Sequence, residues 1–365
     1  MPRRPEPAPA KKPKPASLTV KSLRAAPWLG LALMVMMWPS RAEGSVEAQI
    51  RRAEPGRGRD ARAPQHIPAR GWRDILWRTW NEFNTDQIVS VSGGVTFFGL
   101  LAMFPAIGAF VALYGLFADV GQAQKQLGLL VGVLPHDILA FVGTQMIRIA
   151  GQRDSGLSVA FVVSLLLSLW SANAGVKALI RGLNISYGEQ EHRSYVRVTL
   201  VSLAFTVGAL VFLILAVAGV VAIPLAFAVT GLDPGVFSML RWPAFFLIVV
   251  LGLALLYRYG PCRQHARWRW VSWGSVVAAA LWLAGSLAFS AYLNNFAHYD
   301  RTYGAFGALF GAMIWLWMSA IIVLLGAELN AEIEHQTAVD STTGAPLPLG
   351  ARGAVMADTV GKALD

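Results

Sequence analysis

The residues most able to do chemistry in this sequence are charged and amide side chains that lie within or beside long apolar stretches. Two short sets of them stand out: Asn173, Lys177 and Arg181 in one, and Glu328, Asn330 and Glu332 in the other. The first set recurs every four residues and therefore forms one stripe on a helix. In the second set the two carboxylates lie about one helical turn apart. We treat both sets as candidates for a polar cavity or an ion pair.

Each set has two interpretations that the sequence leaves open. The first could bind a lipid headgroup or another anion, or Lys177 and Arg181 could extend toward water at the cytoplasmic end of a span. The second could be a functional ionisable site, or the end of a helix at the headgroup level. Counting along the two helices puts Lys177 and Glu328 at similar depth, roughly 32–36 Å from the outer ends at 1.5 Å per residue. We therefore predict that these two side chains face each other.

Catalytic and metal-binding patterns are missing from the sequence. No two of the six histidines are spaced as metal ligands usually are, and acidic residues do not cluster beside them. Cys262 is the only cysteine, which excludes an intramolecular disulfide and a zinc site built from cysteines. There is no Walker loop or dinucleotide fingerprint. We expect a protein that is not an enzyme and has no metal and no cofactor.

The composition indicates a membrane protein. Hydrophobic residues make up 55% of the 365, charged residues only 14%, and the mean hydropathy is +0.50, whereas soluble domains carry about 25% charged residues. The net charge of +10 comes largely from a Pro-rich tail and from positions beside apolar stretches. That distribution is typical of positive-inside charge. We therefore expect membrane lipids as partners and no nucleic acid.

Uncharged stretches define the expected fold, an all-α polytopic bundle with about six spans. They cover 87–118, 155–176, 198–232, 242–257, 270–299 and 302–327. A span needs about 20 helical residues. We expect Pro224 to bend the over-long third stretch, and short amphipathic helices broken at Pro135 to fill 119–154.

Before the first span, the segment 71–83 predicts an amphipathic interfacial helix. Its apolar or small side chains recur at helical spacing: Trp72, Ile75, Leu76, Thr79, Trp80 and Phe83. Residues 66–335 form the predicted membrane domain. We expect 1–65 to be a disordered basic Pro-rich extension with a short apolar segment at 26–38, and 336–365 to be a flexible tail. Whether 26–42 is a secretory signal or an extension without a role in the fold stays open.

Lys and Arg near the spans set the orientation. The connections 177–197 and 258–269 carry several basic residues, while the alternate connections carry one Arg each. The basic connections are therefore predicted to be cytoplasmic, together with both termini of a multi-pass inner-membrane protein. Cys262 would then face the cytoplasm.

Small residues open the last span. Gly304, Gly307 and Gly311 include a GxxxG pattern, which favours close helix packing. The contact could lie within the bundle or between two copies of the chain, so a homo-oligomer is one of two alternatives.

Five stretches resemble the YihY/BrkB family of bacterial inner-membrane proteins. They are LLAMFPAIGAFVALYGLF (100–117), SLWSANAGVKALIRGLNISYGEQEHRS (168–194), LLYRYGPCRQHARWRWVSWG (255–274), YLNNFAHYDRTYGAFGA (292–308) and IWLWMSAIIVLLGAELNAEIEH (314–335). The resemblance covers about 70–335 and implies a six-span protein of poorly defined activity. Members carried the label ribonuclease BN, and some are associated with virulence or with envelope and lipid handling. The scattered histidines do not support ribonuclease activity.

Two functions follow as hypotheses. In the first, the protein is a transporter or handles lipids, and its polar groups line a cavity between spans. In the second, it is a non-catalytic envelope scaffold or assembly factor whose polar groups only hold helices together. A polar cavity at membrane depth would distinguish the first from the second.

Overall fold

The described part of the chain is a bundle of long helices. The computed structural model describes residues 49–50, 54–117, 156–211, 234–295 and 306–364, all within the compact unit Val46–Asp365. The elements are η1 (Pro64–His66), α3 (Ala69–Thr85), α4 (Ile88–Phe117), α7 (Gly156–Ser186), the helix Tyr195–Val211, α9 (Pro234–Tyr259), α10 (Trp268–Asn295), α12 (Phe306–His335) and α13 (Val355–Asp358). These ranges contain no β-strand, only an isolated bridge between Ala266 and Thr342. The all-α class is confirmed.

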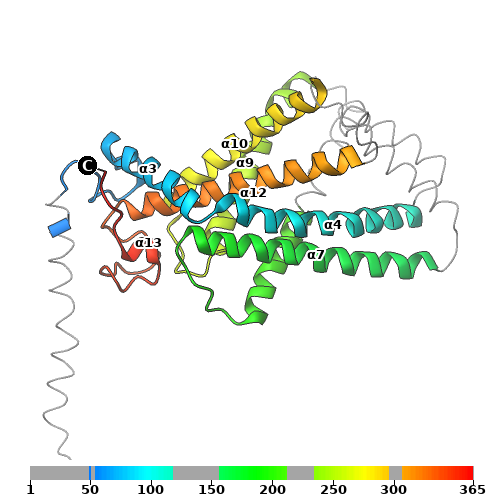
Figure 1. Ribbon diagram of the computed structural model, residues 1–365, viewed down its shortest axis with the longest axis horizontal. Coiled ribbons are helices and arrows are strands. Elements are labelled where there is room, and N and C mark those ends of the chain that lie inside the picture. Colours follow the sequence, from blue (N-terminus) through cyan, green and yellow to red (C-terminus); the bar gives the residue numbers. More distant parts are fainter. Residues whose placement is uncertain (1–48, 51–53, 118–155, 212–233, 296–305, 365) are drawn as a thin grey trace, which may run out of the picture. The chain divides into compact units, whose positions relative to one another are not determined.

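Helix α12 lies at the centre of this bundle. It contacts α3, α4, α7, α10 and α13, and Figure 1 shows it between α10 and α4. Its half near His335 is buried, including Leu324, Ala327 and Ile333. Charged side chains on that half therefore need partners from neighbouring elements.

Glycines allow α10 and α12 to approach closely. A Cβ atom on Gly274 would lie 2.3 Å from the carbonyl oxygen of Gly326, and one on Gly326 would lie 2.5 Å from Tyr257 Oη. Small residues at such positions let two backbones meet, as in packed membrane helices. The buried end of α12 is therefore fixed against α10 by shape.

Helix α7 packs beside α4 and also reaches α12. A Cβ atom on Gly182 would lie 2.9 Å from a methyl group of Leu324. One helical turn further along both helices come Ser186 and Glu328, the last residue of α7 and a buried carboxyl of α12. The contact at Gly182 thus sets the register of the two helices.

Helices α3 and α4 meet at a sharp break. The segments Ala69–Thr85 and Ile88–Met103 are bent by 60°, and Gln87 between them has φ of 51°. The left-handed region is uncommon for a residue other than glycine. Asp86 therefore lies at a defined corner between two helices.

The amphipathic character expected for α3 is present. Its apolar side chains Leu76, Trp77 and Trp80 are exposed, whereas Asp74 and Arg78 are buried against the protein. The apolar Ile75 is buried as well, so it is the exposed Leu76, Trp77 and Trp80 that suit an apolar surrounding.

Each of the six expected stretches overlaps a helix, but six spans are not confirmed. Among the described residues only Trp268–Leu293 and Leu309–His335 are long and apolar enough to cross a membrane, and the bent pair of α3 and α4 would add a third. Tyr195–Val211 and Pro243–Tyr259 are apolar but shorter. Helix α7 extends ten residues past the expected end of its span, so Lys177 and Arg181 lie on the helix and not in a connection.

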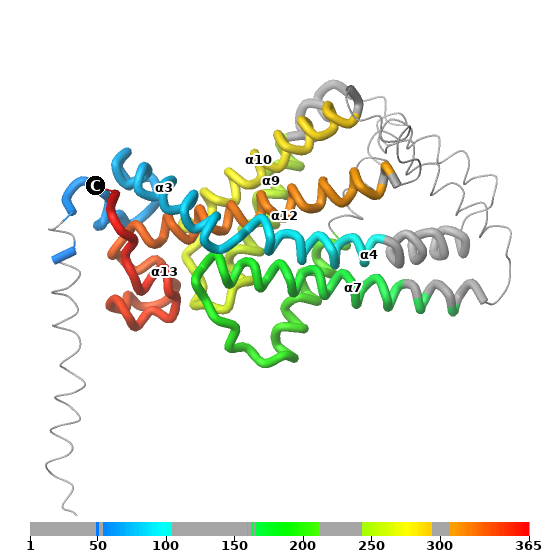
Figure 2. Tube along the Cα trace, in the orientation of Figure 1, coloured from blue at the N-terminus to red at the C-terminus, as the bar shows by residue number. Residues whose placement is uncertain are grey.

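Both ends of the described chain pack against α3 and α12 and differ from the disordered extension and flexible tail expected from the sequence. Arg59 donates to the carbonyl oxygens of Gln336 at 3.0 Å and Gly361 at 2.6 Å. The Leu364 amide donates to Asp74 Oδ1 at 3.1 Å. Figure 2 shows the C-terminal segment beside the segment that leads into α3. Buried polar partners order these residues, a signal that composition does not carry.

Several predictions from the sequence fall outside the described residues: the signal or extension at 26–42, the helices in 119–154, the bend at Pro224, and Gly304.

Candidate functional site

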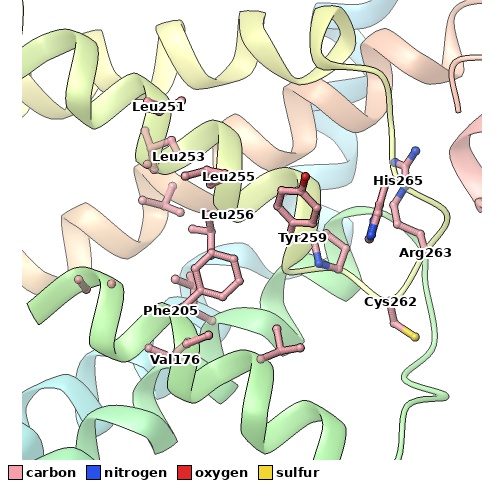
Figure 3. A pocket seen from close by; sticks show the side chains of 18 of the residues that line it. Val176, Phe205, Leu251, Leu253, Leu255, Leu256, Tyr259, Cys262, Arg263 and His265 are labelled. Atoms are coloured by element: carbon pink, nitrogen blue, oxygen red, sulfur yellow. The ribbon is translucent and has the colours of Figure 1, made fainter. Parts of the chain in front are cut away.

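An elongated groove lies between α7, the helix Tyr195–Val211 and α9 (Figure 3). Its volume is about 1130 Å³, slightly above the usual range for small-molecule pockets, about 300–1,000 Å³. Residues from α10, α12, the 260–265 connection and the C-terminal segment complete its lining. We call this cavity the groove.

Most of the groove wall is apolar. Val176 and Phe205 line one side, and Leu251, Leu255 and Leu256 of α9 line the other (Figure 3). Leu251 is 54% exposed although it lies beside a cavity. Gly208 and Gly252 also line the groove, and a Cβ atom on either would meet no atom within 4 Å. The groove therefore offers an apolar surface on which a hydrocarbon chain would be removed from water.

One end of the groove is basic and polar. Arg193, Arg197, Arg263 and His265 line it, together with a few polar or small residues, Tyr259, Cys262, Gln264 and Gly353. Figure 3 shows Tyr259, Cys262, Arg263 and His265 gathered at this end. An apolar wall that leads to a basic end matches an amphiphile with an anionic headgroup.

The three arginines at this end differ in their partners. Arg263 forms two hydrogen bonds with Glu334, at 3.1 and 2.6 Å, and both side chains are almost fully buried. Arg193 binds Glu191 at 2.6 and 2.7 Å and the Gly260 carbonyl oxygen at 2.9 Å. Arg197 is exposed, and within the described residues its guanidinium has no hydrogen bond or ion pair. Arg197 is therefore the arginine available to a ligand.

The ionisable groups at this end have shifted pKa values. The hydrogen bond from Arg193 is the main reason that the pKa of Glu191 falls to about 2, and the pKa of Arg193 rises because Glu191 accepts that bond. Burial lowers the pKa of His265, and the charges of Arg258 and Arg263 lower it further. His265 therefore stays neutral at neutral pH and gains a charge only in acid.

Asn184 joins the two basic connections of the sequence. Its Nδ2 donates to Glu191 Oε2 at 3.0 Å, and its Oδ1 accepts from the Cys262 amide at 2.8 Å. The His192 amide also donates to Cys262 Sγ at 3.5 Å. The two basic connections thus lie together at one end of the bundle.

The polar stripe of α7 faces the helix Tyr195–Val211. Asn173 Oδ1 accepts a hydrogen bond from Ser202, and both residues are buried. Lys177 Nζ lies 3.5 Å from Tyr195 Oη and 4.5 Å from the ring centroid of Tyr195. Arg181 is exposed. Only Asn173 and Lys177 therefore contact a neighbouring helix through this stripe.

The polar residues of α12 are buried and make separate contacts. Glu332 forms an ion pair with Arg78 of α3, whose guanidinium also donates to Gln336 Oε1 at 2.7 Å. Asn330 accepts from the Gly274 amide at 2.8 Å and donates to the Val271 carbonyl oxygen at 3.2 Å. Glu328 is 1% exposed and faces Asp86 and Ser186.

The expected pair of Lys177 and Glu328 does not form. Lys177 contacts Tyr195, whereas Glu328 faces Ser186, nine residues further along α7. Nine residues correspond to about 13 Å of helix. The prediction of this pair was wrong because it assumed that the outer ends of α7 and α12 lie at the same level.

The sequence analysis predicted neither the groove nor the roles of three arginines. Arg78, Arg263 and Arg197 were counted only as positive charge near the membrane. The pairing of Arg78 with Glu332 joins residues 254 positions apart, and that of Arg263 with Glu334 joins residues 71 apart. The density of Arg in 258–269 was the one available signal.

The glycine pattern of α12 is only partly described. Gly311 is buried, yet a Cβ atom there would meet nothing within 4 Å among the described residues. Gly274 and Gly326 make a tight contact between α10 and α12, whereas packing at Gly307 stays a prediction. In the described ranges no group of three or more His, Cys, Asp or Glu is arranged to hold a metal ion.

Apolar helices with outward-facing leucine, valine and tryptophan, joined by buried ion pairs at one end, define an α-helical membrane protein. The chain belongs to the family described as Virulence factor BrkB, whose model matches residues 79–347. The family expected from the sequence is confirmed.

Relatives support the same family. The chain is 30% identical to the ribonuclease-like protein YfkH of Bacillus subtilis (strain 168) over 272 residues, 70% of this chain and 94% of that protein. It is 31% identical to a UPF0761 membrane protein of Verminephrobacter eiseniae (strain EF01-2) over 273 residues, 71% of this chain. That match spans 62% of the relative, so the chain covers less than two thirds of its length. No solved structure matches the chain.

Proposed function

We propose that this protein binds anionic, lipid-like amphiphiles in the groove and takes part in their transport or handling in the membrane. The observation that carries the proposal is the combination of an apolar wall and a basic end in one cavity of about 1130 Å³. A hydrocarbon chain would lie along Leu251 and Phe205, and an anionic headgroup would lie near Arg197. Binding and movement of such a ligand need no covalent step, so we propose no enzymatic activity.

The electrostatics of the basic end favour one anionic group rather than several. Arg193 and Arg263 are already neutralised by Glu191 and Glu334. Arg197 therefore supplies one unbalanced positive charge at neutral pH. A phosphate or carboxylate headgroup would accept charge-assisted hydrogen bonds from it.

We propose that the protein lies in the bacterial inner membrane with both termini and the basic end of the groove on the cytoplasmic side. The contact between the two basic connections supports a common side for them. Cys262, the only cysteine, lies in this region. A membrane-impermeant thiol reagent should label it only after the inner membrane of intact cells is opened. Labelling in sealed cells would reverse the orientation.

The test of binding uses the full chain in nanodiscs that contain equal amounts of phosphatidylglycerol and phosphatidylcholine with the same acyl chains. After release from the nanodiscs, native mass spectrometry counts the lipids that stay bound. We expect phosphatidylglycerol to be retained about fivefold more than phosphatidylcholine, which corresponds to about 1 kcal/mol.

Variants that fill the groove, compared with a control variant outside it, test whether lipid is retained there. Gly208→Trp and Gly252→Trp should lower retention of phosphatidylglycerol because both positions line the groove with open space beside them. Gly94→Trp is the control, since a Cβ atom at Gly94 is equally unhindered and lies outside the groove. Equal retention in all three variants would contradict the proposal and favour the non-catalytic scaffold.

A further inference from the structure

We infer that Asp86, Ser186 and Glu328 form a binding site for a monovalent cation, a sodium ion or a proton, at the break between α3 and α4. The site is separate from the groove, whose lining contains none of the three residues. Three elements supply its groups: the corner between α3 and α4, the last residue of α7, and the buried half of α12.

The first observation is a buried carboxylate oxygen without a hydrogen-bond partner. Glu328 is 1% exposed, and its Oε1 has no hydrogen-bond partner within the described structure. Ser186 is fully buried and lies beside Glu328, but its Oγ forms no hydrogen bond of normal geometry within these ranges. Buried polar atoms are nearly always hydrogen-bonded, and one that is not needs an explanation such as a missing water or ion.

The second observation is the sign of the surrounding charge. Asp86 and Glu332 are the charged groups that act most strongly on Glu328, and both are acidic. Glu332 is neutralised by its ion pair with Arg78 and also lies 3.6 Å from His335 Nδ1. Tyr187, which is buried next to Ser186, carries no positive charge. Asp86 and Glu328 are therefore left without a cationic side chain in the described structure.

The third observation is the position of helix ends. Helix α3 ends at Thr85 and α7 ends at Ser186, so two negative helix termini lie beside the two carboxyl groups. In membrane transporters, the C-terminal ends of interrupted helices often help to hold Na⁺ or H⁺. The bend of 60° between α3 and α4 gives this chain such an interruption.

The number of ligands favours a monovalent cation. Ca²⁺ takes about 6–8 oxygen ligands, and Mg²⁺ usually keeps several waters. The site presents the oxygens of three side chains, two of them buried. Sodium would bind to these oxygens, and a proton would be shared between Asp86 and Glu328. Either would remove part of the repulsion between the two carboxylates.

Thermal unfolding of the purified full chain in detergent tests the site. In one arm, NaCl replaces choline chloride at constant ionic strength and pH; in the other, the pH is lowered from 8 to 6 without sodium. At a ligand concentration of about 100 times Kd, we expect Tm to rise by roughly 5 °C in at least one arm. A rise with NaCl assigns sodium, and a rise only in acid assigns the proton. No rise in either arm, or a rise only with MgCl₂ or CaCl₂, would overturn the inference.

Variants test whether the rise in Tm depends on these three residues. Glu328→Gln should abolish the response and have a higher Tm than the natural protein without sodium at pH 8, because it removes an uncompensated charge. Ser186→Ala removes one oxygen and should raise the sodium concentration for half of the effect several-fold. Asp60→Asn, a change at an exposed carboxylate, should keep the full response. A response that persists in Glu328→Gln would contradict the site even if Ser186→Ala cannot be purified.

Discussion

Arginines at one end of this bundle fall into two kinds. Arg78 and Arg263 are buried, and each is paired with a carboxylate of the last turns of α12. Arg197 lines the groove, is exposed, and has no side-chain partner among the described residues. A charged residue in an apolar chain can therefore have a structural role or a ligand-binding role. Its partner in the folded protein decides which of the two it has.

The largest expected effect is the loss of stability when the buried ion pair of Arg78 and Glu332 is broken. Arg78→Ala should lower the free energy of unfolding by about 3–5 kcal/mol, because it leaves Glu332 buried without its cation. The double variant Arg78→Met with Glu332→Gln should recover part of the loss. Chemical unfolding of the detergent-solubilised protein measures both. If Arg78→Ala costs less than 1 kcal/mol, the distinction between the buried, paired arginines and the exposed Arg197 is wrong.

The second-largest expected effect is a difference in stability between a substitution at a tightly packed glycine and one at a glycine with open space beside it. Gly274→Ala should destabilise the protein by about 1–3 kcal/mol, since its Cβ atom would lie 2.3 Å from a backbone oxygen of α12. Gly252→Ala in the groove wall should be neutral or slightly stabilising, because nothing lies within 4 Å. Unfolding of the two variants under the same conditions measures the difference. Equal losses would show that the groove wall is packed.

A smaller effect should separate the exposed arginines. Arg197→Gln should weaken binding of phosphatidylglycerol about fivefold, because one charged hydrogen bond to the ligand is lost. The Tm of the protein without ligand should not change. Arg181→Gln is the control, since Arg181 is exposed but does not line the groove. Fluorescence titration with a labelled phosphatidylglycerol measures the affinity. Equal weakening by both changes would indicate nonspecific attraction to the charged end.

The smallest effect concerns pH. Burial lowers the pKa of His265 below its ordinary value of 6.5, so the ring is neutral at pH 7.5 and becomes charged only as the pH falls below 6.5. Affinity for phosphatidylglycerol should then increase about twofold toward pH 5. Glu191, with a pKa of about 2, stays charged throughout. His265→Gln should remove the pH dependence, and an unchanged pH profile in this variant would exclude His265.

The features that could be predicted from the sequence are those that depend on the local pattern of residues. Apolar stretches marked the six helices because each needs only its own residues, and the charges of Glu328 and Glu332 on α12 stood out against an apolar background. The amphipathic spacing of apolar residues on α3 was also visible as helical periodicity. These features require no knowledge of which helix lies beside which.

Features that depend on helix neighbours could not be predicted. The pair of Lys177 and Glu328 failed because depth along α7 depends on where that helix meets α12, which Gly182 and Leu324 decide. The segments at both ends are held by hydrogen bonds between residues far apart in the sequence, such as that from Arg59 to Gly361. The groove exists only once α7 and α9 are placed together.

Photo-crosslinking tests the central claim most directly. A phosphatidylglycerol with a photoreactive group in its acyl chain would be added to the full chain in nanodiscs, and mass spectrometry of peptides would locate the crosslinks. The account predicts crosslinks concentrated in 201–209 and 248–256, which line the groove, and their loss in Gly252→Trp. Crosslinks spread evenly over outward-facing residues of α7 such as Val162 and Trp170, unchanged in Gly252→Trp, would contradict it.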